Sequence, residues 1–417
     1  MSGPYALTII APIDGNRRAS LDGALAEIAA DLPNNRLVPF AALSTTHFAR
    51  FVILPGRDGG ADLLVFESNH DGEPDEYCDH LARVAGAGLD ALFGCCIGWP
   101  PGGVADVDGY GEFMRAHRRS AAAFHMGYRG HTKASVLNDL AVWDAVEKWL
   151  DANEPDRAHW KSRSALELRT RIAGAVAAID PSLSLRPAAP DHRAAVRWAA
   201  IIFLLVTIGP IYLLLAASLR LRELAYARSW RPEPTLPVAD LDALRAIEDR
   251  RGVVQNQITH LAIMKNDWRH RLTARVGLWA VNQVSRFIMN EGQLGGILTI
   301  HFARWVTLDD GRLLFLSNYD GSWESYLGEF VDRAHVGLTG VWSNTDGFPP
   351  SRWIVADGAT DEESFKSWTR NRQLSTQVWY SSYPKWSIDN ILNAIAVREG
   401  LYAHFGEKEC RAWLNRL

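Results

Sequence analysis

A short segment that occurs twice constrains the fold of this chain of 417 residues more than any other feature. The sequence HFARFV at residues 47–52 returns as HFARWV at residues 301–306. Each copy is followed by a second matching segment, LLVFESNHDG at residues 63–72 and LLFLSNYDG at residues 313–321. Ordered matches at nearly constant separation indicate a duplicated unit. The sequence therefore predicts two halves that fold alike.

Hydrophobic periodicity predicts the same order of elements in both copies: strand, helix, strand, strand, helix, strand. In the first copy the expected elements are 5–10, 19–32, 46–54, 62–67, 75–85 and a last strand near 121–128. In the second copy they are 259–264, 273–289, 298–308, 312–317, 323–335 and a late strand near 377–380. The tails match as well, because residues 135–142 resemble residues 390–397. The repeat therefore spans about 130 residues and includes a C-terminal helix.

This order is that of the ferredoxin-like βαββαβ unit, an antiparallel sheet with helices on one face. The other face of such a sheet is bare, and two tandem copies can cover each other. We therefore expect an α+β fold in which two ferredoxin-like repeats pair their sheets into an α/β barrel. The expected domains are a first repeat at 1–145, a helical linker at 146–255 and a second repeat at 256–417.

Residues 198–219 form an uncharged apolar segment that is long enough to be a transmembrane candidate. A single span would put the two repeats on opposite sides of a membrane, where they could not close one barrel. Gly209-Pro210 in its middle favours a hairpin or an in-plane insertion, and a long helix buried between domains is the alternative. Arginines flank the segment on both sides: Arg193 and Arg197 before it, and Arg220, Arg222 and Arg228 after it. We expect a membrane-associating insertion that meets a lipid bilayer at the cytoplasmic face of the inner or plasma membrane.

Composition and missing motifs exclude several classes of function. The net charge of -4 and the lack of a basic run interleaved with aromatic residues argue against nucleic acid as a partner. The four cysteines show no zinc-site spacing and indicate a reduced compartment. A glycine-rich phosphate loop, a Gly-x-Ser-x-Gly elbow and a His-Glu-x-x-His motif are all missing from the sequence, so nucleotide, serine and zinc hydrolysis are poorly supported.

The repeated His-Phe-Ala-Arg is the first candidate for chemistry. His301 and Arg304 lie on a predicted strand, where side chains alternate, so they point to opposite faces unless a bulge intervenes. The histidine could be a ligand or general base, and the arginine could bind a carboxylate or propionate. Alternatively, duplication copied a structural strand. Asp320, in the repeated Ser-Asn-x-Asp-Gly, is either functional or a helix cap.

The duplication and element order resemble the dimeric α/β-barrel superfamily, which includes dye-decolorising peroxidases and chlorite dismutases. Asp71-Gly72 and Asp320-Gly321 are similar to the Gly-x-x-Asp-Gly motif of the peroxidases, whose Asp works on the distal side of haem, although Ser replaces the first Gly here. The resemblance implies that Asp320, with Arg304 and His301, is catalytic. It also implies haem as the cofactor. His335 lies about one helix from Asp320 and could be the axial metal ligand of that haem, because imidazole is the commonest protein ligand of haem iron, and Arg304 could bind a propionate. Alternatively, His335 is a structural histidine on its helix.

These observations lead to three hypotheses about function. The first is a membrane-associated oxidoreductase, haem-dependent and peroxidase-like, that acts on an apolar or lipid-derived substrate. The second is a non-catalytic, membrane-associated protein that binds a hydrophobic ligand or partner. The third is a cofactor-independent monooxygenase or isomerase, as in the small barrel enzymes of the same superfamily. The sequence leaves the substrate, the repeat that holds the pocket and the oligomeric state open.

Overall fold

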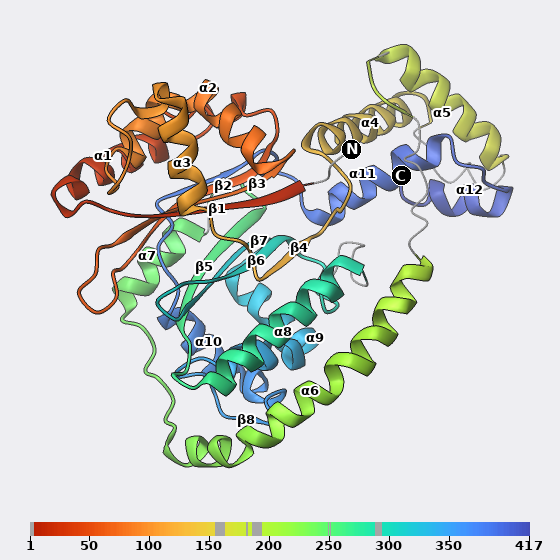
Figure 1. The fold of residues 1–417 in the computed structure, drawn as a ribbon. Coiled ribbons are helices and arrows are strands. Elements are labelled where there is room, and N and C mark those ends of the chain that lie inside the picture. The colour runs from red at the N-terminus through yellow and green to blue at the C-terminus, as the bar shows by residue number, and fades with distance from the viewer. Residues whose placement is uncertain are drawn as a thin grey trace.

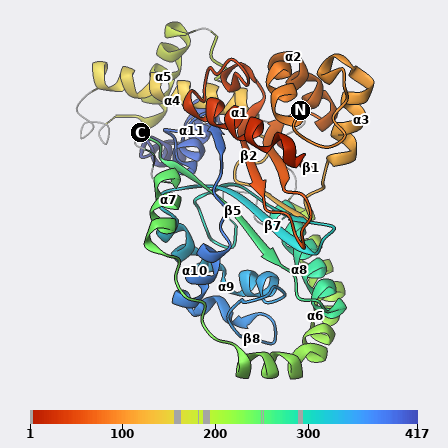
Figure 2. The same cartoon turned by 90° about the vertical axis from the view of Figure 1, so that its left-hand side faces the viewer.

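The structure is a computed structural model that describes residues 4–417 except 155–162, 181, 186–193, 249, 251 and 288–293. The end of the helix expected at 273–289 and the flanking Arg193 therefore lie outside the described residues. The chain folds into an α+β protein in which two four-stranded antiparallel sheets face each other. Figure 2 shows helices α1 to α3 on one side of this pair of sheets and helices α8 to α10 on the other.

Both halves of the chain follow the same order of elements. The first half contains β1 (Pro4–Pro12), α1 (Arg18–Ala30), β2 (Thr46–Leu54), β3 (Leu63–Asp71), α2 (Pro74–Phe93), α3 (Val107–His117), β4 (Ala123–Met126) and α4 (Lys133–Asn153). The second half contains β5 (Gln255–Ile263), α8 (Trp268–Phe287), β6 (Ile300–Thr307), β7 (Arg312–Asp320), α9 (Trp323–Trp342), α10 (Glu362–Asn371), β10 (Val378–Ser381) and α11 (Ile388–Leu401).

Between the halves lie α5 (Ala165–Ile179), α6 (Ala194–Ser229) and α7 (Val238–Glu248), and after the second half comes α12 (Glu407–Leu414). The second half also contains a small hairpin, β8 (Ser351–Arg352) and β9 (Ala356–Asp357), between α9 and α10. Helices α4 and α11 pack side by side at one end of the molecule, where α5 and α12 join them (Figure 1).

The two halves exchange their last strands. The first sheet has the order β1-β3-β2-β10, and the second has the order β5-β7-β6-β4. Tyr380 in β10 pairs with Ala49 in β2, and His125 in β4 pairs with Ala303 in β6. The expectation that each copy completes its own sheet is therefore wrong. The local sequence of a short strand specifies its conformation, whereas the free edge that it joins is decided by the packing of distant segments.

The expected α/β barrel is also wrong. Among the described residues the strands form three antiparallel sheets, and none of them closes into a barrel. The two large sheets meet through side chains instead of through a continuous ladder of backbone hydrogen bonds. Their facing surfaces share an apolar cluster that includes Val52 and Val65 from the first sheet and Val306 and Leu314 from the second. The apolar faces do cover each other, but neither sheet closes on itself among the described strands.

The expected hairpin or insertion between the halves is corrected as well. Helix α6 continues through Gly209 and Pro210 without a break and lies along α8 (Figure 1). Within the described part of the chain, no helix is both long and apolar enough to cross a membrane. A proline removes one hydrogen bond from a helix, and packing can offset that loss. Here Leu219 and Ala216 on α6 are buried against Ile354.

Candidate functional site

A β-bulge in each half turns the repeated histidine toward the other sheet. The strand register shifts between Thr46 and Phe48 in β2, and between Ile300 and Phe302 in β6. In a regular strand His47 and Arg50 would point to opposite faces. With the bulge, both face the other sheet: the ring of His47 lies 5.5 Å from that of Phe302, and Arg50 reaches backbone of β5. A bulge inserts one residue and re-aims side chains in this way.

Two buried arginines connect the sheets by equivalent contacts. Arg50 of β2 donates to the carbonyl oxygens of Ile258 at 2.8 Å and Ser317 at 2.9 Å, and to Oδ1 of Asn318 at 2.6 Å. Arg304 of β6 makes the matching bonds in the other direction, to the carbonyl oxygens of Leu7 at 2.7 Å and Ser68 at 2.9 Å and to Oδ1 of Asn69. The planar guanidinium can satisfy several acceptors at once, which suits it to this position.

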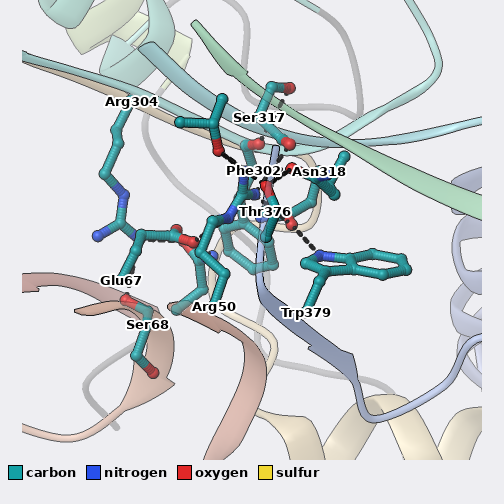
Figure 3. Close-up of polar contacts among 12 residues, drawn as sticks. Arg50, Glu67, Ser68, Phe302, Arg304, Ser317, Asn318, Thr376 and Trp379 are labelled. Carbon is teal, nitrogen blue, oxygen red and sulfur yellow. Dashed lines mark hydrogen bonds and ion pairs between the residues drawn. The ribbon is translucent and has the colours of Figure 1, made fainter. Parts of the chain in front are cut away.

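One carboxylate serves both arginines. Glu67 lies directly opposite Arg50 on β3, with an oxygen 2.7 Å from Nε of Arg50 and the other 2.8 Å from Nη2 of Arg304 (Figure 3). The equivalent residue opposite Arg304 is Leu316, so the second half supplies no carboxylate. All three charged groups are at most 1% exposed. Burial lowers the pKa of Arg304 to about 10, against the opposing effect of Glu67.

The repeated histidines and aspartates pair with each other. Nε2 of His301 lies 2.8 Å from Oδ1 of Asp320, and Nε2 of His47 lies 3.0 Å from Oδ1 of Asp71. Each aspartate also caps a helix through its other oxygen. Asp320 accepts the backbone N–H of Ile388 at the start of α11, and Asp71 accepts that of Lys133 at the start of α4, both at 2.7 Å.

Two tyrosines lie between the histidines. The hydroxyl of Tyr383 is 2.6 Å from Nδ1 of His47 and 2.6 Å from the hydroxyl of Tyr128. Burial raises the pKa of both tyrosines well above the ordinary value and lowers the pKa of His47, because charged forms are poorly solvated there. Nδ1 of His301 has no hydrogen-bond partner among the described residues. The result is a buried chain of hydrogen-bonded groups that runs from Asp71 through His47 and Tyr383 to Tyr128.

The predicted site residues therefore separate into three groups. His301 and Asp320 contact each other, whereas Arg304 belongs to the arginine network around Glu67. His335 lies half-buried on α9, where Nδ1 is 3.0 Å from the carbonyl oxygen of Val331 on the same helix. No group of three or more His, Cys, Asp or Glu side chains that could hold a metal occurs in the described residues.

The residues expected to bind haem do not fit that cofactor. A haem needs a cavity onto which its ligands converge. The space between the sheets is instead filled by packed side chains around Phe48, Phe302 and Trp379, and His335 belongs to another layer of the protein. His335 and Arg304 therefore do not form a haem site in the part of the chain that the structure describes.

An apolar pocket lies elsewhere, on the helical side of the second sheet. It has a volume of about 370 Å³ and is lined by α6, α8 and α9. Small residues leave this space open: a Cβ on Gly337 would meet no atom within 4 Å. Its walls are almost entirely apolar and include Tyr212, Val281, Val284, Trp305, Phe330 and Val341. Among the lining residues that the structure describes, Arg333 carries the one charged side chain.

A second hollow, also of about 370 Å³, is polar and lies on the first half. Its lining includes Ser44, Asp71, Glu76, His80 and Thr132. Asp71 is therefore the point at which the buried histidine and tyrosine chain approaches the surface. Neither hollow is lined by His301, Arg304, Asp320 or His335.

Sequence reasoning did not assign a role to Glu67, Tyr128 or Tyr383. The tyrosines carried a usable signal, because they occupy matching positions ahead of the matching segments 135–142 and 390–397. Glu67 carried a weaker one, since it is a charged residue where the other copy has Leu316. Only the folded chain brings them together with the arginines and histidines.

Comparison with known proteins adds no family. No protein-family model, no curated protein and no solved structure matches this chain.

Proposed function

We propose that this protein binds an apolar small molecule in the pocket between α6, α8 and α9. The observation that carries the proposal is the pocket itself, whose volume of about 370 Å³ falls within the range of small-molecule sites. Apolar lining atoms favour a ligand with a hydrophobic body, because burial removes its surface from water.

The single cation in the lining suggests how a ligand is oriented. Arg333 donates to the carbonyl oxygen of Gly296 at 2.9 Å through Nη1, and its side chain lies at the exposed edge of α9. A guanidinium binds carboxylates through paired hydrogen bonds. A ligand with an apolar body and one acidic group therefore suits this pocket best.

Binding is favoured over catalysis by what the pocket contains. Among the described residues, the lining includes no Asp, Glu, His, Cys, Lys or Ser, the side chains that serve as acids, bases and nucleophiles. A tyrosine, Tyr212, is present, but its hydroxyl lies 3.2 Å from the carbonyl oxygen of Gly340, to which it donates. The described lining residues therefore position no general base for cofactor-independent oxygenation or isomerisation.

Filling the pocket tests the proposal. Gly337→Leu places a side chain in open space within the lining, and Gly174→Leu on α5 is the matched control, because a Cβ there also meets nothing within 4 Å. Binding of a fluorescent apolar carboxylate is measured by titration. We expect Gly337→Leu to weaken binding about tenfold or more and Gly174→Leu to leave it unchanged. Equal affinity in the two variants contradicts the proposal.

The lipid bilayer expected as a partner, and the location at a membrane face, stay predictions. Helix α6 does carry exposed leucines, with Leu213, Leu214 and Leu221 exposed at 70%, 73% and 80%. Sedimentation with lipid vesicles tests this expectation independently of the pocket.

A further inference from the structure

The chain Asp71–His47–Tyr383–Tyr128 has the geometry of a proton-coupled pair of tyrosines. Tyr383 stands between an imidazole nitrogen and a second phenol, with both contacts at 2.6 Å. His47 is fully buried, and the two tyrosines are at most 2% exposed. No bulk water reaches these groups, so a proton that leaves a phenol can move only along the chain.

The order of the groups fixes the direction of the hydrogen bonds. A carboxylate only accepts, so Nε2 of His47 carries the proton that faces Asp71. Nδ1 of the neutral imidazole is then an acceptor, and Tyr383 donates to it. Tyr128 in turn donates to Tyr383. Both phenolic hydrogen atoms therefore point toward His47, and the hydrogen atom on Nε2 of His47 points toward Asp71.

The other half of the chain provides a second acceptor that is not engaged. His301 is held by Asp320 through Nε2, which leaves Nδ1 as an acceptor without a partner. Tyr128 corresponds to Tyr383 in the duplicated sequence, so it is the tyrosine expected beside His301. The ring of Tyr128 lies 5.9 Å from that of His301. Two phenols are thus flanked by two imidazoles, each fixed by a carboxylate, and both halves of the chain keep this arrangement.

We propose that the Tyr383–Tyr128 pair is a one-electron redox site. An external one-electron oxidant takes an electron from Tyr383, and the phenolic proton moves across the hydrogen bond to Nδ1 of His47. The products are a neutral phenoxyl radical, an imidazolium paired with Asp71, and the reduced oxidant. The radical keeps the hydrogen bond that Tyr128 donates. Return of the electron brings the proton back and restores the phenol.

Proton transfer is what makes this oxidation feasible in the interior. Removing an electron without the proton would leave a cationic phenol in a site that excludes water, and an unpaired buried charge is strongly disfavoured. Transfer to His47 instead places the charge next to Asp71, where it is compensated.

Two half-buried tryptophans, Trp386 and Trp143, link this cluster to the surface. The backbone N–H of Trp386 donates to the carbonyl oxygen of Tyr383 at 3.1 Å, and the two indole rings are 5.8 Å apart.

Photo-oxidation of the full chain tests the proposal. Tris(bipyridine)ruthenium(III), generated by a light flash, is the one-electron oxidant, and electron paramagnetic resonance detects the radical. We expect a neutral tyrosyl radical in the unmodified protein that persists about tenfold longer than any radical in Tyr383→Phe. Tyr319→Phe is the control, because that tyrosine is equally buried but its hydroxyl has no hydrogen-bond partner in the part of the chain that the structure describes. It should leave the long-lived signal intact.

The role of the proton acceptor is tested separately. His47→Gln keeps a polar side chain but cannot take up the proton, so radical formation should slow by about tenfold. If either variant fails to fold, as judged by circular dichroism, formation in the unmodified protein is compared in light and heavy water, and slower formation in heavy water is expected. The proposal is overturned if the unmodified protein forms no persistent radical, if Tyr383→Phe retains it, or if neither His47→Gln nor heavy water slows its formation.

Discussion

Removing the carboxylate of Glu67 should destabilise the protein strongly, because two buried guanidinium groups depend on it. In Glu67→Leu both Arg50 and Arg304 lose the one ion pair that each makes within the described residues, while their bonds to backbone carbonyls and to Asn318 and Asn69 remain. Breaking a buried ion pair from one side typically costs about 3–5 kcal/mol. The remaining hydrogen bonds still compensate each guanidinium in part, so we expect the free energy of unfolding to fall by an amount near the lower end, about 3 kcal/mol.

The internal duplication predicts a second substitution that restores part of this stability. Leu316 lies opposite Arg304 as Glu67 lies opposite Arg50. A carboxylate at residue 316 should therefore reach the same pair of arginines from the other sheet. We expect Glu67→Leu combined with Leu316→Glu to recover more than half of the lost free energy of unfolding, about 2 kcal/mol.

Urea denaturation followed by circular dichroism measures these differences. The matched control is Leu314→Glu in the Glu67→Leu background, because Leu314 belongs to the same apolar cluster as Leu316 but lies opposite Val306 instead of an arginine. It should destabilise the protein further. The reasoning is refuted if Glu67→Leu is as stable as the unmodified protein, or if the carboxylate at 314 rescues as well as the one at 316.

Two further changes test the buried histidines. His260 is 1% exposed with neither ring nitrogen bonded among the described residues, and burial lowers its pKa to about 3, below the unfolded value of about 6.5. Because the unfolded state binds this proton first, stability is fully present above about pH 6.5 and is lost as the pH falls toward 3. His260→Ile introduces the residue that the first half has at the equivalent position, Ile9. Between pH 7 and pH 5 its free energy of unfolding, measured by urea denaturation, should fall by about 2 kcal/mol less than that of the unmodified protein. An identical pH dependence in the two proteins contradicts this expectation. Asp320→Ala leaves the ring of His301 and the first N–H of α11 without their acceptor, so thermal unfolding should show a loss of about 2–3 kcal/mol, and a change below about 0.5 kcal/mol would count against the assigned contacts.

The duplication, which is readable in the sequence, indicated most of the secondary structure. Strands at 46–54 and 312–317, and a helix that begins at Trp323, follow from local periodicity and end signals, and the structure has β2, β7 and α9 there. Side-chain alternation also showed that His301 and Arg304 share a face only if the strand is bulged, and β6 contains that bulge.

The pairing of distant segments was decided by tertiary structure. Whether β4 and β10 stay with their own halves or exchange depends on which sheet edge each one meets, and a strand of four residues carries too little information to specify that. Open sheets and a barrel have the same local pattern, so periodicity could not tell them apart. In the same way, α6 is apolar whether it enters a membrane or covers another helix.

What the sequence by itself determined is the repeated unit and the chemical character of its polar residues, because both depend on neighbours along the chain. The tertiary structure alone decided that Glu67 serves two arginines and that two tyrosines meet between two histidines. The contacts of Glu67 with Arg304, of His47 with Tyr383 and of Tyr128 with Tyr383 join residues hundreds of positions apart. Their formation is governed by the burial of whole sheets against each other, which brings polar groups from distant segments within hydrogen-bonding distance.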